Sequence, residues 1–237
     1  DKDRCWFAGT DAHLAFPLVL YKLDNKDCEA RRINLYIADM YTSMHKKFLE
    51  QLHIKVVVNM LGPPDLEIEE ASLYGPRWHF QNDKQKYGAA ERLIGDRLAQ
   101  ADEYLCGPSQ FYAGFGIRYV EHAMADESHN NVKDIFLAVC KDLHAVLEDV
   151  FSAQSDNPTA SVMFHCYLGR NRSAAALLAF VHQVFLWQGE AVPSMESLLL
   201  LLAETRPNIL WRSGQAHTNF IENLLQWEAM NKESAVA

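Results

Sequence analysis

Residues 161–173, SVMFHCYLGRNRS, lead directly into the apolar segment AAALLAFV at positions 174–181. The first residues are mostly apolar, as in a short buried strand, and the alanines and leucines that follow position 173 favour a long helix. The polar residues between these two segments, together with Gly169, indicate a tight loop. This stretch therefore predicts a buried strand, a loop and the beginning of a helix, around which the rest of the chain is organised.

The loop in this stretch has the composition of an anion-binding site. A loop that enters a helix directs several unpaired backbone N–H groups into one small space, where the helix dipole also favours negative charge. Gly169 allows the backbone to approach a ligand closely, and Arg172 offers a planar fork to two phosphate oxygens. Cys166 lies in the same positive field, which should lower the pKa of its thiol and leave a nucleophilic thiolate. A single buried cysteine is more often a core residue, but the spacing from Arg172 favours a phosphate site.

The motif His165-Cys166-x5-Arg172-Ser173 resembles the signature of the cysteine-dependent protein tyrosine phosphatases, most closely the small dual-specificity group. The resemblance implies an α/β fold with a central, mostly parallel sheet flanked by helices. It covers residues 31–62 and 116–230. It implies a single catalytic domain over residues 1–237, with an N-terminal extension at residues 1–30 and a helical insertion at residues 65–113.

The resemblance also implies roles for individual residues. Cys166 would attack phosphorus and form a cysteinyl-phosphate, while Arg172 would bind the phosphate oxygens. Ser173 would hydrogen-bond the sulfur and help it to leave, and His165 would orient the loop. The rest of the phosphate-binding loop would consist of Tyr167, Leu168, Gly169, Arg170 and Asn171. Leu168 and Asn171 stand where the family has a small residue and a serine, which affects the expected substrate more than the expected chemistry.

A phosphatase of this kind needs a carboxylic acid that protonates the leaving oxygen. Asp126 is the preferred candidate, because it follows the aromatic strand around Tyr119 by a short, mostly apolar stretch, as the family's general acid does. Asp134 is a rival that lies nearer to Cys166 in the sequence, although its place in the first turn of a helix is explained by the helix dipole. Glu127 is a second rival.

Composition limits the classes of function. The 237 residues carry a net charge of −9, so general attraction to nucleic acid or to an anionic membrane is not expected. The five cysteines contain no CxxC pair, which favours free thiols in a reducing compartment, and we expect a cytoplasmic or nuclear protein. No apolar run reaches the 18 residues or so that a membrane span requires. No cluster of histidines and cysteines predicts a metal site, and no cofactor is expected.

Hydrophobic patterns predict the other elements. We expect strands at residues 16–21, 33–37, 54–60 and 116–120, with the first at an edge of the sheet because of Pro17. Helices are expected at 44–52 after a cap at Thr42 or Ser43, and at 88–105, 132–151, 173–188, 195–205 and 215–231. The leucine run at 198–202 is apolar nearly all round, which predicts a buried helix.

Three classes of function remain open at this level. The first is a phosphatase acting on phosphotyrosine, phosphoserine or phosphothreonine in proteins, or on phosphoinositides, for which Arg170 inside the loop is a weak indication. The second is a catalytically weak module that binds phosphorylated partners. The third is a rhodanese-like sulfurtransferase, which also carries a catalytic cysteine between a strand and a helix. Ser173 and the candidate acid favour the phosphatase.

Overall fold

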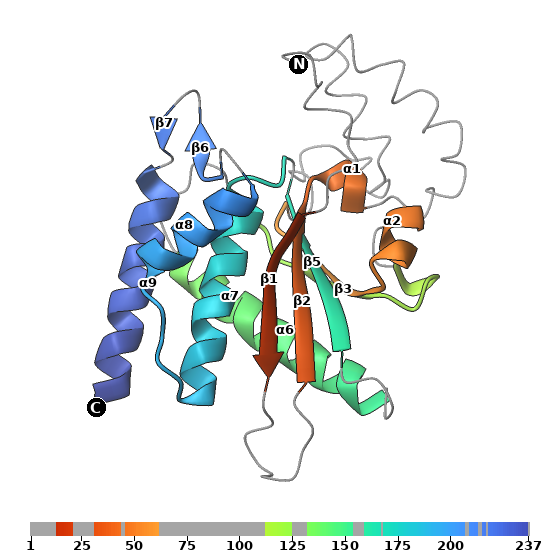
Figure 1. Ribbon diagram of the computed structural model, residues 1–237, viewed down its shortest axis with the longest axis horizontal. Helices are drawn as coiled ribbons and strands as arrows, with labels where there is room; N and C mark the ends of the chain where they lie inside the picture. Colours follow the sequence, from red (N-terminus) through yellow and green to blue (C-terminus); the bar gives the residue numbers. More distant parts are fainter. Residues whose placement is uncertain are drawn as a thin grey trace, which may run out of the picture.

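The structure is a computed structural model that describes residues 13–20, 31–43, 46–61, 112–124, 132–153, 159–166, 168–206, 209–212, 215–216 and 218–236. The described residues form a five-stranded sheet with helices on both faces (Figure 1). Of the predicted insertion at 65–113, only Tyr112 and Ala113 are described, and the predicted helix at 88–105 lies outside the described residues.

Four of the five strands are parallel to one another. They stand in the order β2 (Arg31–Ala38), β5 (Thr159–His165), β3 (Ile54–Asn59) and β4 (Arg118–Glu121). Strand β1 (His13–Leu20) pairs with β2 in the antiparallel direction at one edge, so Pro17 lies in an edge strand as expected. The mostly parallel sheet predicted from the resemblance is thus confirmed.

Helices cover the two faces of the sheet unequally. On one face lie α6 (Val132–Ala153), α7 (Arg172–Gln188), α8 (Met195–Thr205) and α9 (Thr218–Val236), which share the larger core with the strands (Figure 1). On the other face, α2 (Lys46–Gln51) contributes Leu49 to a smaller core with Val57, Met163 and Tyr112. Helix α1 (Met40–Ser43) precedes α2, and a small hairpin of β6 (Trp211–Arg212) and β7 (Gln215–Ala216) precedes α9.

The central strands are buried on both faces, because helices cover both sides of the parallel sheet. Val56, Val57 and Val58 of β3 are all fully buried, although successive side chains of a strand point to opposite faces. Apolar residues therefore follow one another without alternation, which is why residues 54–60 could be identified as a buried strand. Helices α6 and α7 also agree with the sequence prediction, and α7 ends at Gly189 in the left-handed conformation.

The predicted helix at 44–52 corresponds to α2, with residues 44 and 45 outside the described residues. Thr42 and Ser43, which were expected to cap this helix, lie inside α1, and at the beginning of α1 Oδ1 of Asp39 accepts a hydrogen bond from the N–H of Thr42 at 2.7 Å. Asp, Ser and Thr are all common caps, so the sequence offered several adjacent positions with similar preference. The last helix was misplaced, because Gln215 belongs to β7 and α9 begins at Thr218.

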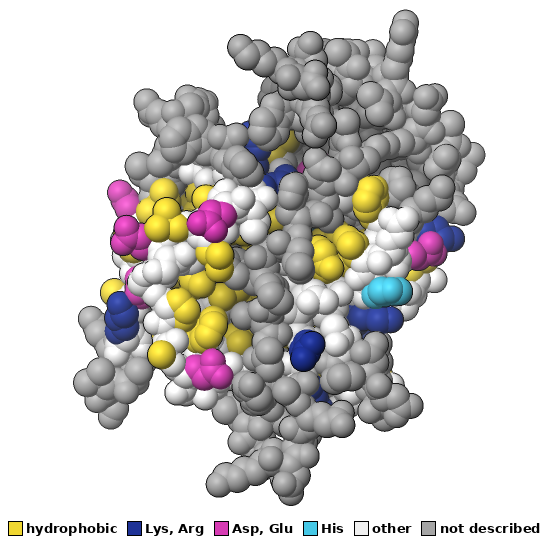
Figure 2. Space-filling model, viewed as in Figure 1, with side chains coloured by type: hydrophobic (Ala, Val, Ile, Leu, Met, Phe, Trp, Pro, Cys, Tyr) yellow, Lys and Arg dark blue, Asp and Glu magenta, His cyan; other side chains and the backbone are white. Residues whose placement is uncertain are grey.

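The prediction that the leucine run of α8 is buried was wrong for two of its five leucines. Leu198 and Leu202 are buried, but Leu200 is 64% exposed and Leu201 is 46% exposed. Figure 2 shows hydrophobic side chains gathered at the surface around α8. Leu198 and Leu202, four residues apart, lie on the face of α8 that packs against the core, and Leu199 packs partly against it, whereas Leu200 and Leu201 face outward.

Within the described ranges, no helix combines the length and the apolar character needed to cross a membrane.

Candidate active site

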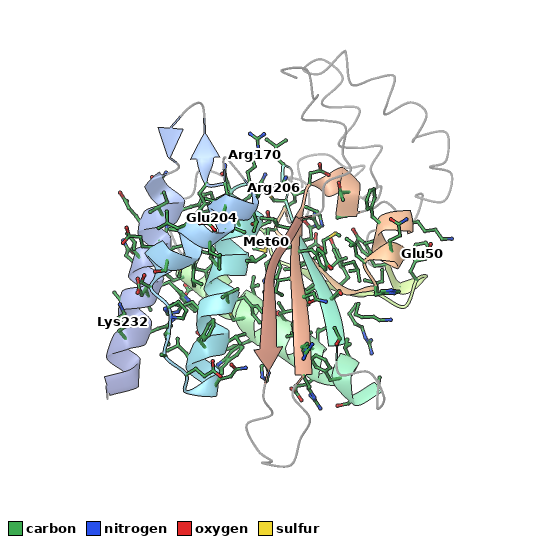
Figure 3. All side chains as sticks on the ribbon, viewed as in Figure 1. Glu50, Met60, Arg170, Glu204, Arg206 and Lys232 are labelled. Carbon is green, nitrogen blue, oxygen red and sulfur yellow. The ribbon has the colours of Figure 1, made fainter. Side chains whose placement is uncertain are left out.

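The loop at 166–171 lies at the carboxyl end of the central parallel strands. It follows β5, which has β2 on one side and β3 on the other, and it leads into α7. The carbonyl of His165, the last residue of β5, accepts a hydrogen bond from the N–H of Met60 at 2.9 Å. Figure 3 shows Met60, Arg170 and Arg206 at this end of the sheet. In parallel α/β sheets this edge is where ligands bind.

Cys166 is buried in a setting that favours its thiolate. The side chain is only 3% exposed, and the hydroxyl of Ser173 donates a hydrogen bond to its sulfur at 3.3 Å. Burial by itself raises the pKa of the Cys166 thiol, but the charge of Arg172, the Ser173 hydroxyl and the backbone N–H groups of Ser173 and Arg170 outweigh burial and lower this pKa. The arrangement stabilises a nucleophilic sulfur at neutral pH.

The beginning of α7 leaves donors directed toward the loop. Asn171 is the N-cap residue, but its side chain makes no capping hydrogen bond to the first N–H groups of the helix. Its carbonyl accepts the N–H of Ala175 at 2.8 Å, which begins the regular helix. Arg172 is the first residue of α7 and is half-buried. This end of the helix can therefore hold an anion beside the sulfur of Cys166, through N–H groups and a guanidinium.

Position 169 requires a glycine because of its backbone conformation and because of the atoms that surround it. Its φ is +63°, a left-handed conformation that glycine adopts with little strain. A Cβ built at this position would overlap the carbonyl group of Ala38 and come within 2.9 Å of the backbone nitrogen of Asp39. The loop therefore packs directly on the backbone at the end of β2.

Two residues from the carboxyl-terminal part of the chain donate hydrogen bonds to carbonyl groups of the loop. Arg206, which ends α8, donates a hydrogen bond from Nη2 to the carbonyl of Leu168 at 3.1 Å. The N–H of Leu210 donates to the carbonyl of Arg170 at 3.0 Å. The sequence predicted a helix at 195–205 but no contact for Arg206, because no local pattern reveals a contact that spans 38 positions.

A second group of polar residues lies next to the loop, at the ends of β3 and β4. Asn59 Nδ2 donates to the hydroxyl of Tyr119 at 2.7 Å and to Oε1 of Glu121 at 3.2 Å, while its Oδ1 accepts the N–H of Leu61 at 2.9 Å. Partial burial raises the pKa of Glu121, although its hydrogen bonds with Tyr119 and Asn59 oppose this effect. Sequence reasoning missed Asn59, because the residue reads simply as the end of an apolar strand.

The structure describes some of the predicted site residues and not others. The structure brings together Cys166, Arg172, Ser173, His165 and Gly169, and it describes Leu168, Arg170 and Asn171 in the same loop. Tyr167, the candidate acid Asp126 and its rival Glu127 lie outside the described residues. The other rival, Asp134, lies in the first turn of α6. Among the described residues, no group of three histidines, cysteines or acidic residues could hold a metal ion.

No protein-family model and no curated protein sequence matches the chain. Comparison of the fold does find similar structures. PTPMT1 aligns with a TM-score of 0.50 and 15% identity over 85% of this chain and 94% of its own. The same protein in complex with PI(5)P aligns with a TM-score of 0.50 and 14% identity, over 85% of this chain and 94% of its own.

A mouse protein described as a dual specificity phosphatase, complexed with zinc tungstate, has a TM-score of 0.50 and 15% identity. The alignment covers 85% of this chain and 86% of the mouse chain. At this level of identity the similarity concerns the arrangement of strands and helices. With its four parallel strands and flanking helices, the chain has the protein tyrosine phosphatase-like fold of the dual-specificity phosphatases.

Proposed function

We propose that this protein is a cysteine-dependent phosphatase that hydrolyses phosphomonoesters. The observation that carries the proposal is the environment of Cys166, whose pKa is lowered by Arg172 and by the hydroxyl of Ser173 despite complete burial. A buried thiol without such partners has a raised pKa, as Cys140 in the core of α6 shows. A nucleophilic cysteine requires a lowered thiol pKa, whereas a cysteine that only packs in the core does not.

The proposed reaction has two steps. The substrate phosphate binds to the N–H groups of the loop and to Arg172, and the Cys166 thiolate attacks phosphorus as the bond to the leaving oxygen breaks. Asp126 donates a proton to that oxygen and becomes a carboxylate. Asp126 then accepts a proton from water, whose oxygen attacks the cysteinyl-phosphate and releases inorganic phosphate. The hydrogen bond from Ser173 stabilises the thiolate that leaves in this second step.

The assignment of Asp126 as the acid is supported by the segment that precedes it. Residues 122–124 follow β4 at the catalytic edge, and the N–H of His122 donates to the carbonyl of Asn59 at 2.9 Å. Met124 is 1% exposed, so the chain is anchored two residues before Asp126. Asp134 is already explained by the first turn of α6, where a carboxylate offsets the helix dipole.

The favoured substrates are proteins that carry phosphotyrosine, phosphoserine or phosphothreonine. Phosphoinositides are the second candidate, supported by the complex of PTPMT1 with PI(5)P and by two arginines at the edge of this loop. Arg170 is part of the loop, and Arg206 donates to its Leu168 carbonyl (Figure 3). Cations at the mouth of the site would attract additional phosphate groups on an inositol ring.

Hydrolysis of p-nitrophenyl phosphate by purified variants tests the chemistry. We expect Cys166→Ser to abolish turnover and Asp126→Ala to lower kcat by about 100-fold, within the usual range for loss of a general acid. The matched control Asp134→Asn should retain the activity of the unmodified protein. Undiminished turnover by Cys166→Ser would exclude the proposed nucleophile. Phosphopeptide binding without turnover by the unmodified protein would instead indicate a binding module, and activity with thiosulfate and cyanide would indicate a sulfurtransferase.

A panel of phosphopeptides and phosphoinositides tests the substrate class. Phosphoprotein specificity predicts higher kcat/KM for phosphotyrosyl or phosphothreonyl peptides than for any phosphoinositide. Substitution of Arg170 by Gln separates the two candidates further, because it should lower kcat/KM for a polyphosphorylated inositol lipid more than for a peptide with one phosphate. A higher kcat/KM for a phosphoinositide than for the phosphopeptides would indicate that phosphoinositides are the substrates.

A further inference from the structure

A second pocket lies away from the catalytic loop, between the beginnings of β3 and β4 and the last turns of α6. Its volume is about 590 Å³. Its walls include Lys55, Ile117, Arg118, Tyr119, Val146 and Val150. A pocket of this size falls in the range that accommodates small organic ligands.

The position of the pocket in the sheet separates it from the catalytic site. Lys55 is the second residue of β3 and Arg118 is the first residue of β4, whereas Cys166 follows the last residue of β5. All three strands are parallel, and Ile54 at the beginning of β3 lies opposite Ser161 of β5. Five residues of extended chain separate Ser161 from Cys166, which amounts to about 16 Å. A ligand in this pocket is therefore not the substrate at the catalytic loop.

The pocket combines an apolar wall with two cations that have no acidic partner among the described residues. Val146 and Val150, one turn apart on α6, form the wall together with Ile117. Among the described residues, neither Lys55 nor Arg118 forms an ion pair, and the pocket lining contains no carboxylate. Two cations without a described acidic partner, placed beside aliphatic side chains, are unexpected in a chain with a net charge of −9. They provide a site for one negative group at the edge of an apolar space.

One wall of the pocket is held in place before any ligand binds. The hydroxyl of Tyr119 accepts the hydrogen bond from Asn59 at 2.7 Å, and its ring stacks on Tyr112 with centroids 5.2 Å apart. Tyr112 is in turn anchored by its hydroxyl, which donates to the carbonyl of Ser43 at 3.0 Å. Tyr119, one of the residues that line the pocket, is fixed from two sides, so ligand binding costs little additional ordering of this residue.

We propose that this pocket binds an amphipathic organic carboxylate, with its apolar body against α6 and its carboxylate between Lys55 and Arg118. The guanidinium of Arg118 can donate two parallel hydrogen bonds to a carboxylate, and the ammonium of Lys55 adds a second charge. The apolar body replaces water along Val146 and Val150, which an inorganic anion would not do.

Titration calorimetry of the whole protein with sodium octanoate tests this site, with uncharged 1-octanol as the second probe. We expect one octanoate to bind per chain and 1-octanol to bind at least about tenfold more weakly, because it lacks the charge-assisted contacts. The double variant Lys55→Gln with Arg118→Gln should weaken octanoate binding by about tenfold or more for the same reason. Ala113→Trp, an exposed position in the pocket wall, should block binding by filling the space.

Lys141→Gln is the matched control, because Lys141 is exposed on α6 but does not line the pocket. It should bind octanoate as the unmodified protein does. The proposal is overturned if the unmodified protein shows no saturable octanoate binding, or if the double variant and Ala113→Trp both bind octanoate with unchanged affinity. In the latter case the ligand binds elsewhere, for example on the exposed leucines of α8. Equal affinity for octanoate and 1-octanol would overturn the role of the two cations.

Discussion

At the scale of single residues, the environment of Cys166 distinguishes this thiol from Cys140, the other described cysteine. Burial alone would keep the thiol protonated, as it does for Cys140, whose pKa burial raises. Around Cys166 the charge of Arg172 and the donors from Ser173 and Arg170 reverse the outcome and lower the pKa. The same burial excludes water from the sulfur, so each of these contacts acts in a medium of low dielectric constant and is strengthened by it.

The first prediction concerns the pH dependence of Cys166. Because its pKa is lowered in the folded protein, the thiolate should persist as the pH falls below the ordinary thiol pKa, and it should be lost only as the pH passes through the lowered value. Ser173→Ala removes one stabilising donor and should move the midpoint of alkylation by iodoacetamide to higher pH. The rate of alkylation as a function of pH measures both midpoints. Identical midpoints for the two proteins would show that Ser173 does not stabilise the Cys166 thiolate.

The second prediction uses two glycines with nearly the same φ. Gly169 has φ +63° and Gly189 has φ +64°, but a Cβ at Gly169 would overlap the carbonyl of Ala38, whereas nothing lies within 4 Å of a Cβ at Gly189. Gly189→Ala should cost only the backbone strain of about 1 kcal/mol. Gly169→Ala should cost more and should also displace the loop, with loss of most p-nitrophenyl phosphate turnover. Urea denaturation and kinetics of both variants check this, and equal effects would contradict the steric explanation.

At the scale of an element, α8 shows how one helix divides its leucines between core and surface. Its N-cap, Ser194, accepts a hydrogen bond from the N–H of Ser197 at 3.2 Å, which fixes where the helix begins. From that beginning, Leu198 and Leu202 face the core, whereas Leu200 and Leu201 face outward. The cap thus positions the helix, and the neighbouring helices determine which leucines are covered.

The third prediction compares two leucines of α8. Leu202→Ala should lower the free energy of unfolding by about 2–5 kcal/mol, because the side chain is fully buried and its removal leaves a cavity. Leu200→Ala, with 64% of the residue exposed, should change this free energy by less than about 0.5 kcal/mol. Both values come from urea denaturation followed by circular dichroism. A large effect of Leu200→Ala would mean that something covers this surface in solution.

At the scale of the whole molecule, the loop that follows β5 is supported by segments that are distant in the sequence. The end of β2 supports Gly169, Met60 after β3 donates to the carbonyl of His165, and Arg206 after α8 donates to the carbonyl of Leu168. The loop therefore depends on the complete fold, because its own hydrogen bonds do not determine its shape. Its position in the centre of the sheet makes these contacts available from both sides.

The fourth prediction tests the contact from Arg206. Arg206→Ala removes the donor to Leu168, so the loop should lose part of its preorganisation, and KM for p-nitrophenyl phosphate should rise several-fold. Arg31→Gln is a suitable control, because Arg31 is another half-buried arginine, paired with Glu148 at 3.2 Å and belonging to β2. It should change stability by at most about 1 kcal/mol and leave KM unchanged. Equal KM values for both variants would show that Arg206 does not position the loop.

The sequence predicted most of the fold and the central part of the site. Residues 54–60 were recognisable because helices cover both faces of a parallel sheet, which leaves β3 apolar throughout. The junction at Cys166, Gly169 and Arg172 was recognisable because its chemistry is local: a strand, a glycine turn and a helix within a few residues. The candidate acid Asp126 stays a prediction, since it lies outside the described residues.

The sequence by itself predicted the candidate nucleophile Cys166 and the candidate phosphate-binding loop, because their residues lie within a few positions of one another, and the resemblance that these residues carry predicted the mostly parallel sheet. Only the tertiary structure decided that Asn59, Arg206 and the backbone of Ala38 support the site, and that Leu200 and Leu201 face outward. These outcomes depend on contacts between segments far apart in the chain, and a local pattern contains no information on which surface another segment will cover. Lys55 and Arg118 likewise line one pocket only because β3 and β4 pair side by side in the folded sheet.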